Sequence, residues 1–99
     1  MSATLIWVAA YLIGSIPCGV LIARAQNIDI REHGSGNIGA TNVARILGKK
    51  PGILTLLGDC LKGIAPVGVA MRFLENPVEI ALTGFIAFCG HLFPVFLKF

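Results

Sequence analysis

Three long apolar stretches alternate with two polar segments along the chain. Residues 3–23 carry no charged side chain, residues 52–71 carry only Asp59 and Lys62, and residues 78–97 carry only Glu79. A helix of about 20 residues, rising ~1.5 Å per residue, matches a hydrocarbon core of roughly 30 Å. The pattern predicts an all-α, polytopic integral membrane bundle, with residues 1–99 forming one membrane domain of three transmembrane spans.

Glycine and proline interrupt these stretches. Gly14-Ser15-Ile16-Pro17 lies inside the first stretch and predicts a kink that frees backbone carbonyls. Gly63 and Pro66 predict an irregular second half for the second span. A cleaved signal peptide is the competing interpretation of the first stretch, but no basic segment precedes it and its apolar length exceeds that of a typical signal.

The polar segment of residues 24–51 is strongly basic and contains only two acidic residues, Asp29 and Glu32. By the positive-inside tendency this segment is cytoplasmic and the N-terminus is external. Anionic lipid headgroups favour the same placement. Its cations are Arg24, Arg31, Arg45, Lys49 and Lys50.

Composition agrees with a bilayer environment. Apolar residues make up 56% of the chain and charged residues 13%, against about 25% charged in soluble domains. No basic stripe with interleaved aromatic residues is present, which argues against a nucleic-acid partner. Cys18, Cys60 and Cys89 lie in apolar stretches without the spacing of a metal site, so we expect buried thiols and no bound metal.

The segment Gly34–Arg45 reads Gly-Ser-Gly-Asn-Ile-Gly-Ala-Thr-Asn-Val-Ala-Arg. Its glycines match the dinucleotide-binding pattern literally, but a membrane span precedes them in place of a strand. A Walker A loop is also excluded, because Gly48-Lys49-Lys50 lacks the earlier glycine and the Ser or Thr.

The donors in this segment nevertheless suit phosphate. Glycines allow backbone N–H groups to approach an anion, and Arg45 offers a planar fork that matches phosphate oxygens. The remaining candidate ligands are Gly34, Ser35, Gly36, Asn37, Gly39, Thr41 and Asn42. The alternative is a flexible interhelical linker, and composition alone leaves both interpretations open.

Two further sites contain ionisable groups. Asp59 and Lys62 are three residues apart and lie on one helical face. In one interpretation, Lys62-Gly63 contacts a second phosphate and Asp59 supports the lysine. In the other, the two charges form an ion pair that only neutralises itself. His91 is a candidate general base or phosphate donor, although a lone helical histidine is more often a packing residue. The His-x-x-x-x-Asp dyad of thioester-dependent acyltransferases is missing, because Phe96 occupies the fifth position after His91.

Together these motifs closely resemble the bacterial acyl-phosphate-dependent glycerol-3-phosphate acyltransferase family, often called PlsY. The likeness runs through nearly the whole chain, and the twelve-residue motif ending at Arg45 is its most specific part. The other matching segments are Tyr11–Pro17, Asp29–Arg31, Asp59 with Lys62-Gly63 and Pro66-Val67, and Gly90–Phe99.

The resemblance implies transfer of a fatty acyl group from acyl phosphate to the 1-hydroxyl of sn-glycerol 3-phosphate, giving lysophosphatidate and phosphate. Neither coenzyme A nor acyl carrier protein is the donor, and no cofactor is used. Ser35, Arg45 and His91 are then the catalytic residues, and Lys62-Gly63 contacts glycerol 3-phosphate. A small transporter or scaffold with an anion-binding loop is the rival hypothesis.

The chain departs from the family in length. Family members run to roughly 200 residues with seven membrane helices, so we expect an N-terminal part that is inactive alone. The expected location is the bacterial inner membrane, with several passes and a cytoplasmic first loop.

Overall fold

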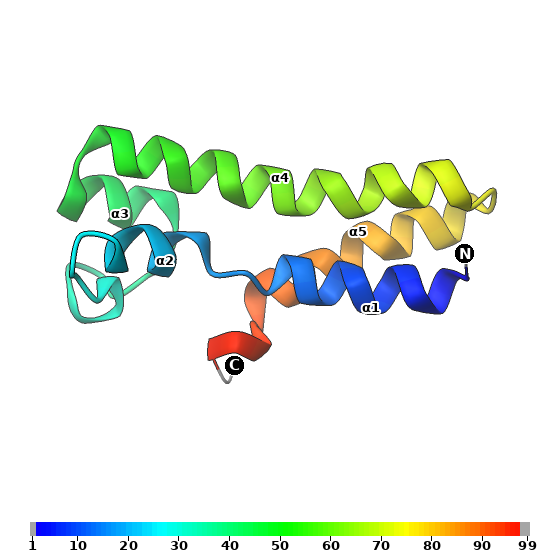
Figure 1. The fold of residues 1–99 in the computed structure, drawn as a ribbon, viewed down its shortest axis with the longest axis horizontal. Coiled ribbons are helices and arrows are strands. Elements are labelled where there is room, and N and C mark those ends of the chain that lie inside the picture. The colour runs from blue at the N-terminus through cyan, green and yellow to red at the C-terminus, as the bar shows by residue number, and fades with distance from the viewer. Residues whose placement is uncertain (1, 98–99) are drawn as a thin grey trace. The chain divides into compact units, whose positions relative to one another are not determined.

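The computed structural model describes residues 2–97, and every regular element among them is helical. The order is α1 (Ala3–Gly14), α2 (Cys18–Arg24), the 3₁₀ turn η1 (Ile30–Glu32), α3 (Ala40–Leu47), α4 (Lys49–Phe73), α5 (Pro77–Leu92) and the 3₁₀ turn η2 (Val95–Leu97), as labelled in Figure 1. The predicted all-α class is confirmed.

Three helical segments are long and apolar enough to cross a membrane. They cover Ala3–Arg24, Lys49–Phe73 and Pro77–Leu97. Large apolar side chains remain exposed along all three, such as Leu5, Leu61 and Phe85, each more than 60% accessible. Water would make such exposure costly, whereas lipid or further protein covers it without penalty.

The contacts of the chain divide it into two compact units. The first consists of Met1–Ile16 with Cys60–Phe99, and the second of Pro17–Asp59. In the first unit, α1 packs along α5 (Figure 1). Glycine allows this close approach, because a Cβ on Gly14 would collide with the carbonyl of Ala87 and one on Gly90 with the carbonyl of Tyr11.

Polar side chains stabilise the same helix pair. The indole Nε1 of Trp7 donates to the carbonyl of Glu79 at 3.3 Å, and the hydroxyl of Tyr11 donates to the carbonyl of Phe93 at 2.6 Å. The two acceptors lie near opposite ends of α5: Glu79 is in its first turn, and Phe93 directly follows its last residue. The two bonds therefore fix α5 along the length of α1.

The predicted kink is confirmed, because α1 ends at Gly14 and α2 begins only at Cys18. In an unbroken helix the carbonyl of Ile16 would accept a hydrogen bond from the residue four positions later. Here it accepts one from the ammonium Nζ of Lys62 at 3.0 Å. Lys62 is only 7% exposed, so its ammonium is largely removed from solvent.

The expected irregularity in the second span was wrong. Helix α4 runs without interruption from Lys49 to Phe73 and contains Pro66 in its interior. Proline removes one backbone donor, but membrane helices tolerate it where neighbouring groups compensate. A Cβ on Gly63 would meet no atom within 4 Å, so this glycine marks an open side of the helix and not a break.

The second unit gathers short helices around a small core. Its buried apolar residues are Val20 and Ala23 on α2, Ile30 in η1 and Val43 on α3. Gly19 lies directly against the carbonyl of Ile38, so α2 supports the loop that precedes α3. On the other side of α3, a Cβ on Gly52 would lie 2.5 Å from the Cβ of Ala44, which brings α3 against the first turns of α4.

Candidate phosphate-binding site

The loop between η1 and α3 turns on two glycines with positive φ. Gly34 has φ +56° and Gly36 has φ +75°, a region that L-residues with a side chain rarely adopt. The backbone N–H of Gly36 closes the turn by donating to the carbonyl of His33 at 2.9 Å. The two glycines therefore shape the loop; neither lines the pocket described below.

Asn42 holds this loop against α3. Its Oδ1 accepts from the backbone N–H of Ser35 at 3.2 Å, and its Nδ2 donates to the carbonyls of His33 and Asn37 at 3.1 and 2.9 Å. The partners fix the amide orientation, because a flipped amide would put oxygen against two carbonyls. Asn42 is 2% exposed, and both of its amide hydrogens are engaged within the protein.

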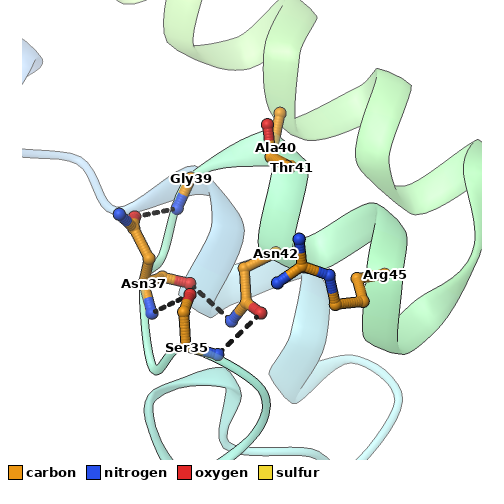
Figure 2. A pocket seen from close by; sticks show the side chains of 7 residues that line it. All are labelled: Ser35, Asn37, Gly39, Ala40, Thr41, Asn42 and Arg45. Atoms are coloured by element: carbon orange, nitrogen blue, oxygen red, sulfur yellow. Dashed lines mark hydrogen bonds between the residues drawn. The ribbon is translucent and has the colours of Figure 1, made fainter.

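A second set of bonds orients the side chains of the loop. Asn37 Oδ1 accepts from the N–H of Gly39 at 2.8 Å, and Ser35 Oγ accepts from the N–H of Asn37 at 3.3 Å (Figure 2). Among residues 2–97 the Ser35 hydroxyl has no protein acceptor, so its proton is available to a ligand.

These residues surround a cavity of about 340 Å³, which lies within the usual size range of small-ligand sites. The first turn of α3 faces it through Gly39, Ala40 and Thr41. The first N–H groups of an α-helix have no intrahelical partner and carry partial positive charge, which favours an anion there. The complete lining is Ser35, Asn37, Gly39, Ala40, Thr41, Asn42 and Arg45.

Arg45 is the residue of the pocket lining whose side chain carries a formal positive charge. It lies one turn after Thr41 on α3, and Figure 2 shows its guanidinium extending over Asn42. Within residues 2–97 this guanidinium forms no hydrogen bond or ion pair, and the side chain is exposed. An exposed guanidinium beside a hydroxyl and a helix N-terminus is a suitable arrangement for an oxyanion such as phosphate.

Asp29, one of the two acidic residues that precede the loop, is paired outside the pocket. Asp29 caps η1 by accepting from the backbone N–H of Arg31 at 3.1 Å and from its Nε at 3.3 Å. The backbone N–H first, and the guanidinium second, lower the pKa of Asp29 below its usual value of 3.8. Asp29 therefore remains ionised but paired, and Arg31 is engaged away from Arg45.

The other predicted site residues lie outside the pocket lining. Asp59 is on α4 in the second unit, whereas Lys62 and Gly63 on α4 and His91 on α5 belong to the first unit. The Lys62 ammonium donates to the backbone carbonyl of Ile16, as described above. The ring of His91 stacks on Phe88 with centroids 6.5 Å apart.

Sequence reasoning missed one feature of the site, the helix α3. It treated residues 24–51 as an irregular loop and did not predict α3, whose N-terminus builds half of the pocket. The run Ala40–Leu47 after Gly39 was the available signal, because it contains no helix breaker. Among residues 2–97 no group of three or more His, Cys, Asp or Glu side chains could hold a metal ion.

Fold and site together define a multi-pass membrane protein of apolar helices, with a polar loop in which a hydroxyl, a guanidinium and a helix N-terminus line one cavity. Residues 4–99 match the family model described as glycerol-3-phosphate acyltransferase. The chain belongs to the glycerol-3-phosphate acyltransferase family.

Curated relatives with the name glycerol-3-phosphate acyltransferase include one from Geotalea daltonii, 55% identical over 93% of this chain and 47% of its own length. Another, from Trichlorobacter lovleyi, is 55% identical over 100% of this chain and 52% of its own. The chain thus spans about half the length of the curated relatives it matches.

A solved structure of the same family also matches this chain. The crystal structure of PlsY, an integral membrane glycerol 3-phosphate acyltransferase, in its glycerol 3-phosphate form has a TM-score of 0.92 and 44% identity to this chain. The match covers 100% of this chain and 50% of that one. The lysophosphatidic acid form of PlsY matches with a TM-score of 0.90 and 43% identity.

Proposed function

We propose that the protein to which this chain contributes transfers a fatty acyl group from acyl phosphate to the 1-hydroxyl of sn-glycerol 3-phosphate. The observation that carries the proposal is the pocket of Ser35, Arg45 and the N-terminus of α3 in a chain of this family. Its donors suit a phosphate group, and its place between membrane spans suits a substrate that is part lipid.

The reaction needs positioning and charge more than a protein nucleophile. The acyl carbon–oxygen bond to phosphate breaks as the glycerol oxygen bonds to the same carbonyl carbon, and inorganic phosphate leaves. Because acyl phosphate is already activated, alignment and preorganised charge carry the catalysis. The hydroxyl proton passes to His91 or to a phosphate oxygen of the substrates.

The proposed role of each residue follows from the hydrogen-bond donors and charges that it presents to a ligand. Arg45 neutralises a phosphate, and Ser35 donates its hydroxyl proton to phosphate or to the developing oxyanion. Gly34, Gly36 and Asn42 hold the loop in shape. We assign Lys62 and Gly63 to the glycerol 3-phosphate contact on family resemblance, and Asp59 to their support.

The family membership favours catalysis over the rival hypothesis of a transporter or scaffold with an anion-binding loop. The proposed orientation places residues 24–51 in the cytoplasm of a bacterium, at the inner membrane, because five cations of the chain lie there. Glycerol 3-phosphate would then enter from the cytosol and the acyl donor from the bilayer.

Turnover by the full-length protein in liposomes tests this function. With palmitoyl phosphate and glycerol 3-phosphate we expect lysophosphatidate and inorganic phosphate in equal amounts, and neither product when glycerol 3-phosphate is omitted. Arg45→Ala should lower the rate by about 100-fold or more, as for loss of a preorganised charge contact. A wild-type protein that binds both substrates without forming lysophosphatidate would refute the proposal.

A further inference from the structure

The segment Tyr11–Pro17 resembles the family, but the proposed function gives none of its residues a role. It contains the end of α1 and the break before α2. Tyr11 lies in the last turn of α1, which packs along α5 within the first compact unit (Figure 1). Its hydroxyl reaches the end of α5, whose last turn contains His91.

Tyr11 contacts the chain on both sides of His91. Its hydroxyl donates to the carbonyl of Phe93, two residues after His91, at 2.6 Å. Its backbone carbonyl lies against Gly90, the residue before His91, where an added Cβ would collide with it. One residue of α1 therefore holds this part of α5 at two points, and His91 lies between them.

Both contact points are themselves fixed. The Tyr11 carbonyl accepts from the backbone N–H of Ser15 at 2.9 Å and from the Ser15 hydroxyl at 2.8 Å, and Ser15 is fully buried. At the other point, the N–H of Phe93 closes the last turn of α5 by donating to the carbonyl of Cys89 at 2.8 Å. Pro94 follows and cannot continue the helix. The Tyr11 hydroxyl thus binds a defined helix end.

The bond to Phe93 also suits a membrane. Carbonyls in the last turn of a helix lack helical donors, and the hydrocarbon region offers them no water. Phe93 belongs to Pro77–Leu97, a segment long and apolar enough to cross a membrane. A hydroxyl from the neighbouring span supplies a donor there, so its loss should affect the position of the helix end.

We propose that Tyr11 is a positioning residue that fixes the place of His91 for acyl transfer. This role rests on the proposed function, in which His91 is a candidate acceptor of the hydroxyl proton. The His91 ring stacks on Phe88 of the same helix, with centroids 6.5 Å apart, so α5 itself orients the ring. Tyr11 fixes where that end of α5 lies relative to α1.

A double-mutant cycle in the full-length protein tests the role of Tyr11. Tyr11→Phe removes the hydroxyl and keeps the ring, and turnover is measured with palmitoyl phosphate and glycerol 3-phosphate. We expect kcat/KM to fall by about tenfold, because misplacing a reacting group by ~1 Å can cost about 100-fold. In a protein that already carries His91→Ala, the same change should have no further effect, since Tyr11 acts through His91.

Trp7→Phe is the matched control. It also removes a hydrogen bond between α1 and α5 and keeps an aromatic ring. Its acceptor, the carbonyl of Glu79, is in the first turn of α5, at the opposite end from His91. Both variants should lower the unfolding midpoint, and only Tyr11→Phe should lower kcat/KM.

NMR of histidine-labelled protein provides a measurement that does not require turnover. The ring signal of His91 is identified by its loss in His91→Ala. Tyr11→Phe should shift or broaden this signal, and Trp7→Phe should leave it at its wild-type position. If His91→Ala has no measurable turnover, this comparison replaces the cycle.

Several results overturn the inference. These are wild-type kcat/KM or an unchanged His91 signal in Tyr11→Phe, an equal loss of kcat/KM in Trp7→Phe, and a full further loss in the His91→Ala background. Each of them leaves the proposed function intact as long as the wild type forms lysophosphatidate. Full activity of His91→Ala would refute the role of His91 and the inference with it. A wild type that forms no lysophosphatidate would defeat the proposed function itself.

Discussion

At the scale of single residues, Asn42 is the side chain on which the site depends most. It is buried and makes three hydrogen bonds that join α3 to the turn around Ser35. The sequence marked Asn42 only as one of several amide donors for a ligand. Its role depends on how the turn folds back to bring the carbonyls of His33 and Asn37 against its amide, which the residue pattern does not show.

Asn42→Ala should therefore loosen the loop while leaving α3 helical. Removal of one buried partner costs about 1–3 kcal/mol, because the groups left behind lose their hydrogen bonds. We expect faster amide hydrogen exchange over residues 34–39 and loss of acyl transfer, measured by mass spectrometry and turnover. Gln26→Ala, at an exposed position of the same unit, serves as the control. Unchanged exchange over residues 34–39 would contradict the role given to Asn42.

Lys62 illustrates how sequence alone can leave two roles open. The resemblance assigns it to glycerol 3-phosphate, whereas the structure shows its ammonium on the carbonyl of Ile16, next to Pro17. A carbonyl freed at a helix break inside a membrane needs a donor, and a buried ammonium provides a strong one.

Lys62→Met should lower the stability of the protein in detergent by about 1–3 kcal/mol, because the freed carbonyl loses a charged donor. Lys62→Arg, which keeps the donor, should recover much of that loss in a thermal unfolding experiment. If Lys62→Met instead raises only the KM for glycerol 3-phosphate and leaves the unfolding midpoint unchanged, the structural role is wrong.

Asp29 gives the loop a dependence on pH. Its folded-state pKa lies below the ordinary value of 3.8, because the N–H and guanidinium of Arg31 stabilise the carboxylate. The ionised Asp29 carboxylate therefore stabilises the fold above its unfolded-state pKa, and this stabilisation is lost as the pH falls through the lowered folded-state pKa. Asp29→Asn should therefore be less stable than wild type at neutral pH.

That difference should shrink as the pH is lowered from 7 through the lowered folded-state pKa of Asp29, because the wild-type carboxylate then also becomes neutral. Unfolding midpoints of both proteins across this range provide the measurement. A difference that stays constant or grows on acidification would show that Asp29 does not act through its charge.

At the scale of elements, the apolar pattern was sufficient to predict the helices but not their ends or their packing. The kink before Pro17 was predicted correctly because proline and glycine act locally. The continuity of α4 through Pro66 was not predicted, since it depends on the surroundings of the helix. The close pairing of α1 and α5 was also invisible, because it depends on where Gly14 and Gly90 meet the other helix.

The pairing of α1 with α5 can be tested by filling its closest contact. Gly90→Val should destabilise the protein by about 1–3 kcal/mol, because its side chain would collide with the backbone of Tyr11. Gly68→Ala on α4 is the matched control, since nothing lies within 4 Å of its added Cβ. Equal unfolding midpoints for Gly90→Val and wild type would contradict the packing described for these helices.

At the scale of the whole molecule, the chain combines two kinds of surface, one apolar and one polar and cationic. Apolar helices suited to lipid flank a loop in which a helix N-terminus, a hydroxyl and a guanidinium converge. Composition predicted the apolar membrane helices, and the placement of the charged residues predicted where the polar loop lies in the sequence. The family resemblance suggested the chemistry. The hydrogen bonds by which Asn42 holds the turn around Ser35 against α3, and the cavity that Ser35 and Arg45 both line, required the structure.

The central claim is that this cavity binds a phosphate group through Arg45, and equilibrium binding tests it most directly. Glycerol 3-phosphate and a palmitoyl phosphonate that cannot transfer its acyl group are titrated into the full-length protein, wild type and Arg45→Ala. Arg31→Ala, whose guanidinium is held by Asp29 outside the pocket, is the control. Loss of Arg45 should weaken at least one ligand by about tenfold or more, as expected for a charged hydrogen bond, while the control binds as wild type does. Unchanged affinities of Arg45→Ala for both ligands would contradict the account.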